Sequence, residues 1–180
     1  MDEEIRQKVL TLLEQHRIMT AATLRPDGWP QATTVDYASE GLSLYFLSSL
    51  NSQKAANLAR DDRVSLTIDH DAPDIMAICG LSMAGHVRVV TDMAEAGRVM
   101  KMLVRKYPEQ TSLPGSMPRP EEVRIFRVAP TVISVLDYSK GFGHSDLVSV
   151  PDAQEEVSEK VDEKSSLASD PPAWTQTTTR

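Results

Sequence analysis

The chain has 180 residues, of which 41% are hydrophobic and 25% are charged, a balance typical of a globular protein with one hydrophobic core. A formal net charge of -7 argues against nucleic-acid binding, which needs a basic surface. No apolar run reaches the roughly 20 residues that cross a bilayer, and the acidic start MDEEIRQ differs from a signal peptide, so we expect a cytoplasmic protein without a membrane partner.

The first part of the chain predicts a helix followed by a β-meander. In DEEIRQKVLTLLEQHR, apolar residues recur at i, i+4, i+7 and i+8 from Ile5, which is the spacing of one helix face. The pattern then becomes β-like, and the turn sequences RPDGWP and SEG separate three segments. The predicted strands cover residues 18–24, 31–38 and 42–47.

The second part predicts further strands around one more helix. Alternation over 64–68 marks a strand, and IMAICGLSMAGHVRVV predicts a long one, in which Gly80 and Gly85 suggest bends or bulges. Asp92-x-x-Glu95 is a typical helix start, and that helix ends before Pro108. VRIFRVAPTVISVLDYS predicts two more strands, broken at Ala129-Pro130.

The elements together predict a mainly β fold of six to seven strands, a small closed or partly closed barrel with peripheral helices. We assign residues 1–150 to this domain. Residues 151–180 contain seven acidic and three basic residues and almost no apolar periodicity. Such a composition cannot offset the entropy of ordering, so we expect an acidic, flexible C-terminal tail.

The stretch SSLNSQK sets small polar side chains before a lysine at the start of a predicted helix. Ser48, Ser49 and Ser52 supply hydroxyl groups, and Lys54 supplies a positive charge. Free N–H groups at a helix N-terminus attract anions, so this pattern is typical of a phosphate site. The alternative is an ordinary helix cap by Asn51 or Ser52, with a lysine exposed to solvent.

The run DGWPQATTVDYASEGLSLYFLSSLNSQKAANLARDDRVSLTI resembles the FMN-binding split-barrel proteins of the pyridoxamine 5'-phosphate oxidase-like superfamily. The likeness extends over about residues 5–138 and implies an antiparallel split β-barrel that forms a homodimer with FMN at the subunit interface. The positions that match the family's phosphate-binding residues are Leu47, Ser48, Ser49, Ser52, Gln53 and Lys54. The positions that match the strand beside the flavin ring are Thr33, Thr34 and Val35.

The sequence departs from the true oxidase at charged positions. Ala32 and Gln53 stand where the oxidase has arginines, and Tyr37 stands where it has a lysine. Fewer fixed charges predict weaker FMN binding than in the oxidase. The Arg-Leu-x-Pro segment that grips the substrate phosphate is absent after Trp174, which argues against oxidation of pyridoxamine 5'-phosphate.

Candidate groups for chemistry are few. The glycine-rich segment DYSKGFGHSDLV carries His144, which is a candidate proton donor beside a flavin, or else part of a simple turn. The single cysteine, Cys79, excludes an internal disulfide and a thiolate metal cage, and we assign no metal site. We therefore expect an FMN-dependent oxidoreductase whose substrate or electron donor is unassigned. The alternative is a non-catalytic protein that binds flavin, haem or a deazaflavin.

Overall fold

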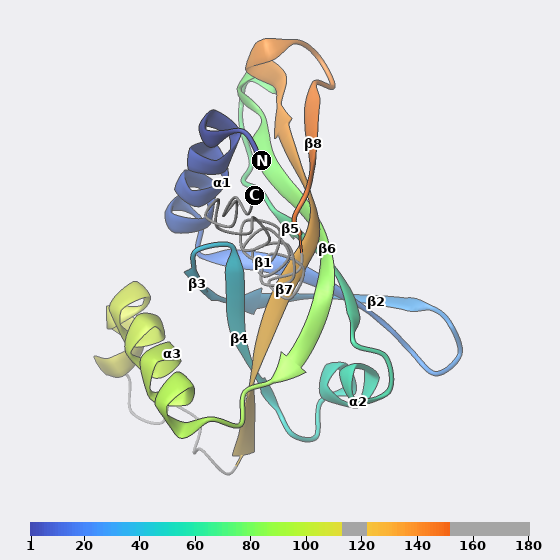
Figure 1. The fold of residues 1–180 in the computed structure, drawn as a ribbon, viewed down its shortest axis with the longest axis vertical. Coiled ribbons are helices and arrows are strands. Elements are labelled where there is room, and N and C mark those ends of the chain that lie inside the picture. Colours follow the sequence, from blue (N-terminus) through green and yellow to red (C-terminus); the bar gives the residue numbers. More distant parts are fainter. Residues whose placement is uncertain (113–121, 152–180) are drawn as a thin grey trace, which may run out of the picture. The chain divides into compact units, whose positions relative to one another are not determined.

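The computed structural model describes residues 1–112 and 122–151, in which helices surround one antiparallel sheet (Figure 1). The α-helices of this part are α1 (Glu3–Gln15), α2 (Gln53–Arg60) and α3 (Met93–Lys106). Short 3-10 turns are η1 (Ile75–Ala77), η2 (Pro108–Ser112) and η4 (Tyr138–Lys140). Among the described helices, none combines the length and the apolar character that a membrane crossing needs.

Eight strands of the described residues form the sheet. They are β1 (Ile18–Leu24), β2 (Pro30–Asp36), β3 (Ala38–Glu40), β4 (Ser43–Ser49), β5 (Arg63–Ile68), β6 (Cys79–Val89), β7 (Val123–Asp137) and β8 (Ser145–Ser149). Their order is β2-β1-β5-β6-β7-β4-β3, and β8 pairs with β7. Every pairing is antiparallel, which confirms the predicted mainly β split barrel with peripheral helices. The short β8 lies in the segment that we interpreted as a glycine-rich loop.

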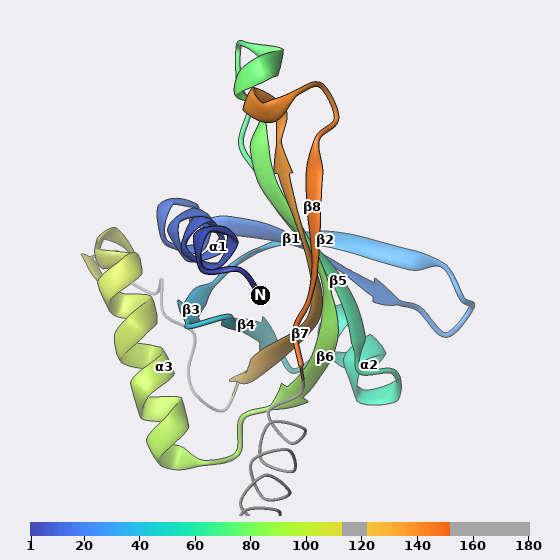
Figure 2. The ribbon, with the colours of Figure 1, turned by 45° about the horizontal axis from the view of Figure 1, so that its top comes forward.

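The predicted helices are confirmed, including their first turns. The side chain of Asp2 caps α1 by accepting a hydrogen bond from the Glu4 N–H at 2.8 Å. Asp92 caps α3 in the same way, through the N–H groups of residues 94 and 95. Figures 1 and 2 show α1 and α3 together on one side of the sheet strands, and α2 on the other side. The strand-to-helix corner at α2 therefore stands apart from the other two helices.

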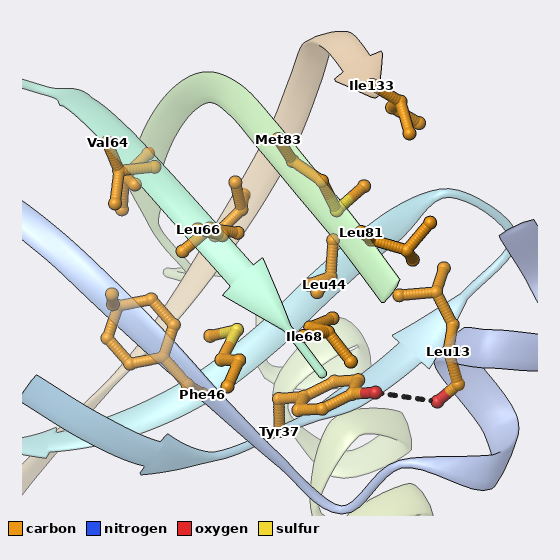
Figure 3. Close-up of a cluster of buried hydrophobic side chains, with 14 of the residues drawn as sticks. Leu13, Tyr37, Leu44, Phe46, Val64, Leu66, Ile68, Leu81, Met83 and Ile133 are labelled. Atoms are coloured by element: carbon orange, nitrogen blue, oxygen red, sulfur yellow. Dashed lines mark hydrogen bonds between the residues drawn. The ribbon is translucent and has the colours of Figure 1, made fainter. Parts of the chain in front are cut away.

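A cluster of buried apolar side chains from α1, β4, β5, β6 and β7 forms the core (Figure 3). Phe46 of β4 and Phe126 of β7 stack there, with ring centroids 5.2 Å apart. The hydroxyl of Tyr37 donates to the Leu13 carbonyl at 2.9 Å, which joins α1 to the sheet. Each fully buried side chain of this size contributes roughly 1.5–3 kcal/mol of transfer free energy, so this cluster is the main source of stability.

One strand prediction is wrong. β7 runs as a single strand through Pro130 instead of breaking there. Pro130 lies opposite Gly85 of β6, where the register shifts between Ala84 and Gly85. Such a shift locally interrupts the ladder, so a residue without an N–H is tolerated. A Cβ atom at Gly85 would collide with the Ala129 carbonyl oxygen and lie 2.9 Å from the Pro130 Cα atom. The bulge predicted at Gly85 is thus confirmed.

The predicted acidic tail, residues 151–180, lies outside the described residues except for its first position. Part of the proline-rich connection before β7, residues 113–121, also lies outside them.

Candidate functional site

The β4–α2 corner, which we define as Ser48, Ser49, Ser52 and Lys54, brings together the hydroxyl groups predicted to bind an anion. Ser48 ends the buried part of β4, and its Oγ atom lies 2.8 Å from the Oγ atom of Ser52. Ser52 is the N-cap of α2 and accepts a hydrogen bond from the Ala55 N–H at 3.1 Å. The capping interpretation is therefore confirmed for Ser52. The first N–H groups of α2 and the side chain of Lys54 lie at the same corner as these two hydroxyls.

Lys54 is buried, with a relative exposure of 8%. Its Nζ atom lies 5.7 Å from the centroid of the Phe46 ring. Within residues 1–112 and 122–151, no group forms a hydrogen bond or an ion pair with this ammonium. Burial lowers the pKa of Lys54 below its ordinary value. The alternative of a solvent-exposed lysine side chain is therefore wrong, and the corner holds a partly desolvated cation without a described anionic partner.

The corner is held against β1 and β2 by a buried amide. Asn57, one turn along α2, is fully buried and donates to the Thr23 Oγ1 atom at 3.0 Å and to the Gln31 Oε1 atom at 3.2 Å. The side chain of Gln53 donates in turn to the Asn57 Oδ1 atom at 2.9 Å. Gln53 thus turns along the helix toward Asn57, and this network fixes the direction in which the N-terminus of α2 points.

The hydrogen-bond pattern between β1 and β2 determines which residues of β2 can offer main-chain groups to a ligand. The N–H of Arg25 donates to the Trp29 carbonyl at 3.0 Å across the hairpin, and antiparallel pairs alternate between bonded and non-bonded types. The main-chain groups of Thr33 and Val35 therefore point toward β1. Those of Thr34 point toward the other edge of β2, which no strand of the described residues pairs.

The side chains of the same three residues face two ways. Thr33 shares its face with the buried Ala21, and its Oγ1 atom is buried without a hydrogen-bond partner among the described groups. Val35 packs against the core, and Thr34 is exposed. A buried hydroxyl without a hydrogen bond is costly. A bound ligand that hydrogen-bonds to the Thr33 hydroxyl would remove this cost.

Two more predicted positions lie at the end of β4. The Leu47 side chain packs toward α3 on the face opposite the corner, so only its main chain is available there. Ser49 is exposed, and its Oγ atom accepts a weak bond from the Asn51 N–H at 3.4 Å. The structure therefore brings Ser48, Ser52 and Lys54 together most closely.

His144 lies in the turn between η4 and β8, away from this corner in the chain. Gly141 and Gly143 adopt φ values of +138° and +75°, which L side chains rarely adopt, so the turn interpretation is confirmed. The His144 Nε2 atom is 3.2 Å from the Asp146 Oδ2 atom, at ion-pair distance but not aligned for a hydrogen bond. Lys140 reaches the same oxygen at 3.3 Å. A role as proton donor stays a prediction.

Sequence reasoning missed two residues at the corner. Asn57 carries the local signal of a polar residue on the apolar face of a short helix, four positions after Gln53. Arg124 of β7 carries no such signal, because only the strand register places it opposite Ser48.

The sequence of this chain matches one protein-family model. The family is described as pyridoxamine 5'-phosphate oxidase, and the match covers residues 5–137. No curated protein matches the chain.

Solved structures with the same fold include heme proteins and a protein described as hypothetical. A heme binding protein from Mycobacterium smegmatis has a TM-score of 0.67 and 18% identity over 80% of this chain, which spans 57% of that protein. The conserved hypothetical protein Rv2991 from Mycobacterium tuberculosis has a TM-score of 0.62 and 24% identity, over 86% of this chain and 94% of that one. The heme storage protein HutZ from Vibrio cholerae has a TM-score of 0.58 and 18% identity, over 69% and 88%. At these identities the likeness shows the fold alone.

Proposed function

The chain belongs to the pyridoxamine 5'-phosphate oxidase family, and on this premise we propose that it is a flavoprotein that binds FMN at the β4–α2 corner. The observation that carries the proposal is the buried side chain of Lys54, whose ammonium is partly desolvated and has no anionic partner among the described residues. A buried charge is costly unless it is paired. A phosphate monoester would supply the missing charge, and the N–H groups at the start of α2 favour an anion in the same place.

The residues of the corner divide the binding task. Lys54 would pair with the phosphate, and the Ser48 and Ser52 hydroxyls would donate hydrogen bonds to it, since each can rotate its proton toward an acceptor. The open edge of β2 at Thr34 offers one N–H and one carbonyl to the polar edge of the flavin ring. The isoalloxazine ring supplies electron transfer when bound, so we propose an FMN-dependent oxidoreductase with an unassigned substrate.

A homodimer is the assembly that we propose. Support comes from the outward face of the sheet, where two rows of small uncharged side chains cross five strands. The rows are Thr34, Thr20, Thr67, Ser82 and Ser134, and Ala32, Ala22, Ser65, Ala84 and Val132. All ten residues are exposed or partly exposed. A face of small, uncharged side chains lets a second copy of the same sheet approach closely without burying an unpaired charge.

Haem binding is the second candidate. It is favoured by the likeness of the fold to the heme binding protein from M. smegmatis and the heme storage protein from V. cholerae. Lys54 fits this candidate less well, because it lies with hydroxyl groups at a helix N-terminus, which is the chemistry of a phosphate site.

The absorption spectrum of the purified full chain tests both candidates. We expect absorption peaks at about 375 and 450 nm, the generic spectrum of oxidised flavin. The protein should show them either as purified or after FMN is added and unbound FMN is removed. A Soret band together with no retained FMN would favour the haem alternative. A colourless protein that retains neither would contradict the proposal.

A further inference from the structure

Two neighbouring cross-strand pairs of β4 and β7 lie at the β4–α2 corner. The first is the stacked pair of Phe46 and Phe126, and Lys54 lies above Phe46. The second, two residues further along both strands and therefore on the same face, is Ser48 with Arg124. Directly opposite residues have Cβ atoms about 4.5–5.5 Å apart, so the long Arg124 side chain starts beside the serine.

Arg124 differs from two other arginines, on β6 and β7, in having no partner among the described residues. Arg88 and Arg127 lie opposite each other on β6 and β7, and both reach the buried carboxylate of Glu95, at 2.9 and 3.6 Å. Arg124 is exposed, and in residues 1–112 and 122–151 nothing bonds to it or pairs with its charge. Its guanidinium is therefore available to a ligand at the corner.

We propose that Arg124 is a second cation of the phosphate site and that, with Lys54, it makes the site select FMN over the unphosphorylated flavin. This inference rests on the proposed function. A phosphate monoester carries close to two negative charges at neutral pH, and one lysine neutralises only one of them. The planar guanidinium can hold two phosphate oxygens with two parallel N–H groups, a fixed fork that the lysine ammonium lacks.

The position of Arg124 at the rim matches such a role. Lys54 is buried, whereas Arg124 is exposed and can move over a phosphate after it arrives. The charge that the sequence lacks at Ala32 and Gln53 would thus be replaced from β7, a strand that lies more than 70 residues further along the chain.

The test compares FMN with riboflavin, which differs from it only by the phosphate. Both ligands are titrated into the wild-type chain, Arg124→Ala and Arg124→Lys by flavin fluorescence. We expect Arg124→Ala to weaken FMN binding about tenfold to a hundredfold and to leave riboflavin binding unchanged. Arg124→Lys should lie between, because it keeps the charge and loses the fork. Arg98→Ala, an exposed arginine of α3, is the matched control and should bind FMN like the wild type.

Each possible result separates this inference from the proposed function. If the wild-type chain binds FMN and Arg124→Ala binds it equally well, the inference fails and the proposed function stands. Equal losses for FMN and riboflavin would also overturn the inference, because the arginine would then not act on the phosphate. A wild-type chain that binds no FMN overturns the proposed function and this inference together.

Discussion

Replacement of Lys54 by methionine should raise the stability of the ligand-free protein and weaken FMN binding in the same variant. Methionine keeps the length and the apolar stem of lysine and removes the charge. Because Lys54 is 8% exposed, the ammonium gives up part of its hydration in the folded chain. Burial lowers its pKa, so the folded state resists the charge at neutral pH. The substitution removes that penalty, and methionine fits above the Phe46 ring.

The two effects differ in size and in sign. Removal of an unpaired buried charge should stabilise the ligand-free chain by on the order of 1 kcal/mol, which raises the melting temperature by about 2–4 °C for a chain of this length. Loss of a charge-assisted hydrogen bond should weaken FMN binding about tenfold to 150-fold. At an FMN concentration 100 times the wild-type Kd, stabilisation of about 2.7 kcal/mol would fall to about 0.4 kcal/mol after a hundredfold loss.

Thermal unfolding with and without FMN measures both effects on one sample. Lys101→Met, at an exposed position of α3, is the matched control and should change neither the melting temperature nor the shift caused by FMN by a measurable amount. A Lys54→Met variant that is less stable without ligand, yet keeps the full FMN shift, would refute the reasoning, since the lysine would then be a structural residue.

Three further predictions follow from single positions. Gly85→Ala should destabilise the chain by about 2 kcal/mol or more in urea unfolding, because the added Cβ atom would collide with the backbone of β7. Gly97→Ala should instead stabilise the chain by about 0.5–1 kcal/mol, because Gly97 lies on the exposed side of α3 with open space around it. Burial, helped by the charge of Arg17, lowers the pKa of Lys106 to about 8, so its ¹³Cε resonance should titrate near pH 8, and a midpoint above pH 10 would contradict the burial argument. Since the unfolded chain keeps that proton up to about pH 10.5, the stability relative to Lys106→Met should rise with pH between these values. Ala84→Arg should convert the proposed dimer to a monomer in light scattering, and an unchanged mass would count against this face as the interface.

The sequence predicted those parts of the fold that local patterns control. The spacing in α1 and the cap at Asp92 depend on residues within one or two turns, and both are confirmed. The break predicted at Pro130 failed, because a strand tolerates a proline beside a bulge, here the unpaired Thr131 opposite the step from Ala84 to Gly85. The close approach of β7 at this point requires Gly85, which lies 45 residues earlier and carries no local sign of its partner.

In the candidate site, too, the features set by neighbouring residues were predictable and those set by distant residues were not. The hydroxyls and the lysine of the β4–α2 corner are neighbours in sequence, so their meeting at one helix N-terminus was predictable. The burial of Lys54 was not, because it depends on Phe46 and on the packing of α2 through Asn57. Burial is also what changes the meaning of the lysine, since an exposed lysine is stable without a ligand and a buried unpaired one is not.

Arg124 alters the expected strength of FMN binding for the same reason. A count of charges along 30–54 finds one cation, Lys54, where the oxidase has more, and it predicts weak binding. A count in space adds the guanidinium opposite Ser48, which would restore about one charge-assisted contact. The two cations differ in exposure, since the side chain of Lys54 is buried, whereas Arg124 lies at the surface, where salt screens a charge more strongly. If both bind the phosphate, FMN affinity should therefore fall with added salt mainly through Arg124, and the salt dependence should become weaker in Arg124→Ala than in Lys54→Met.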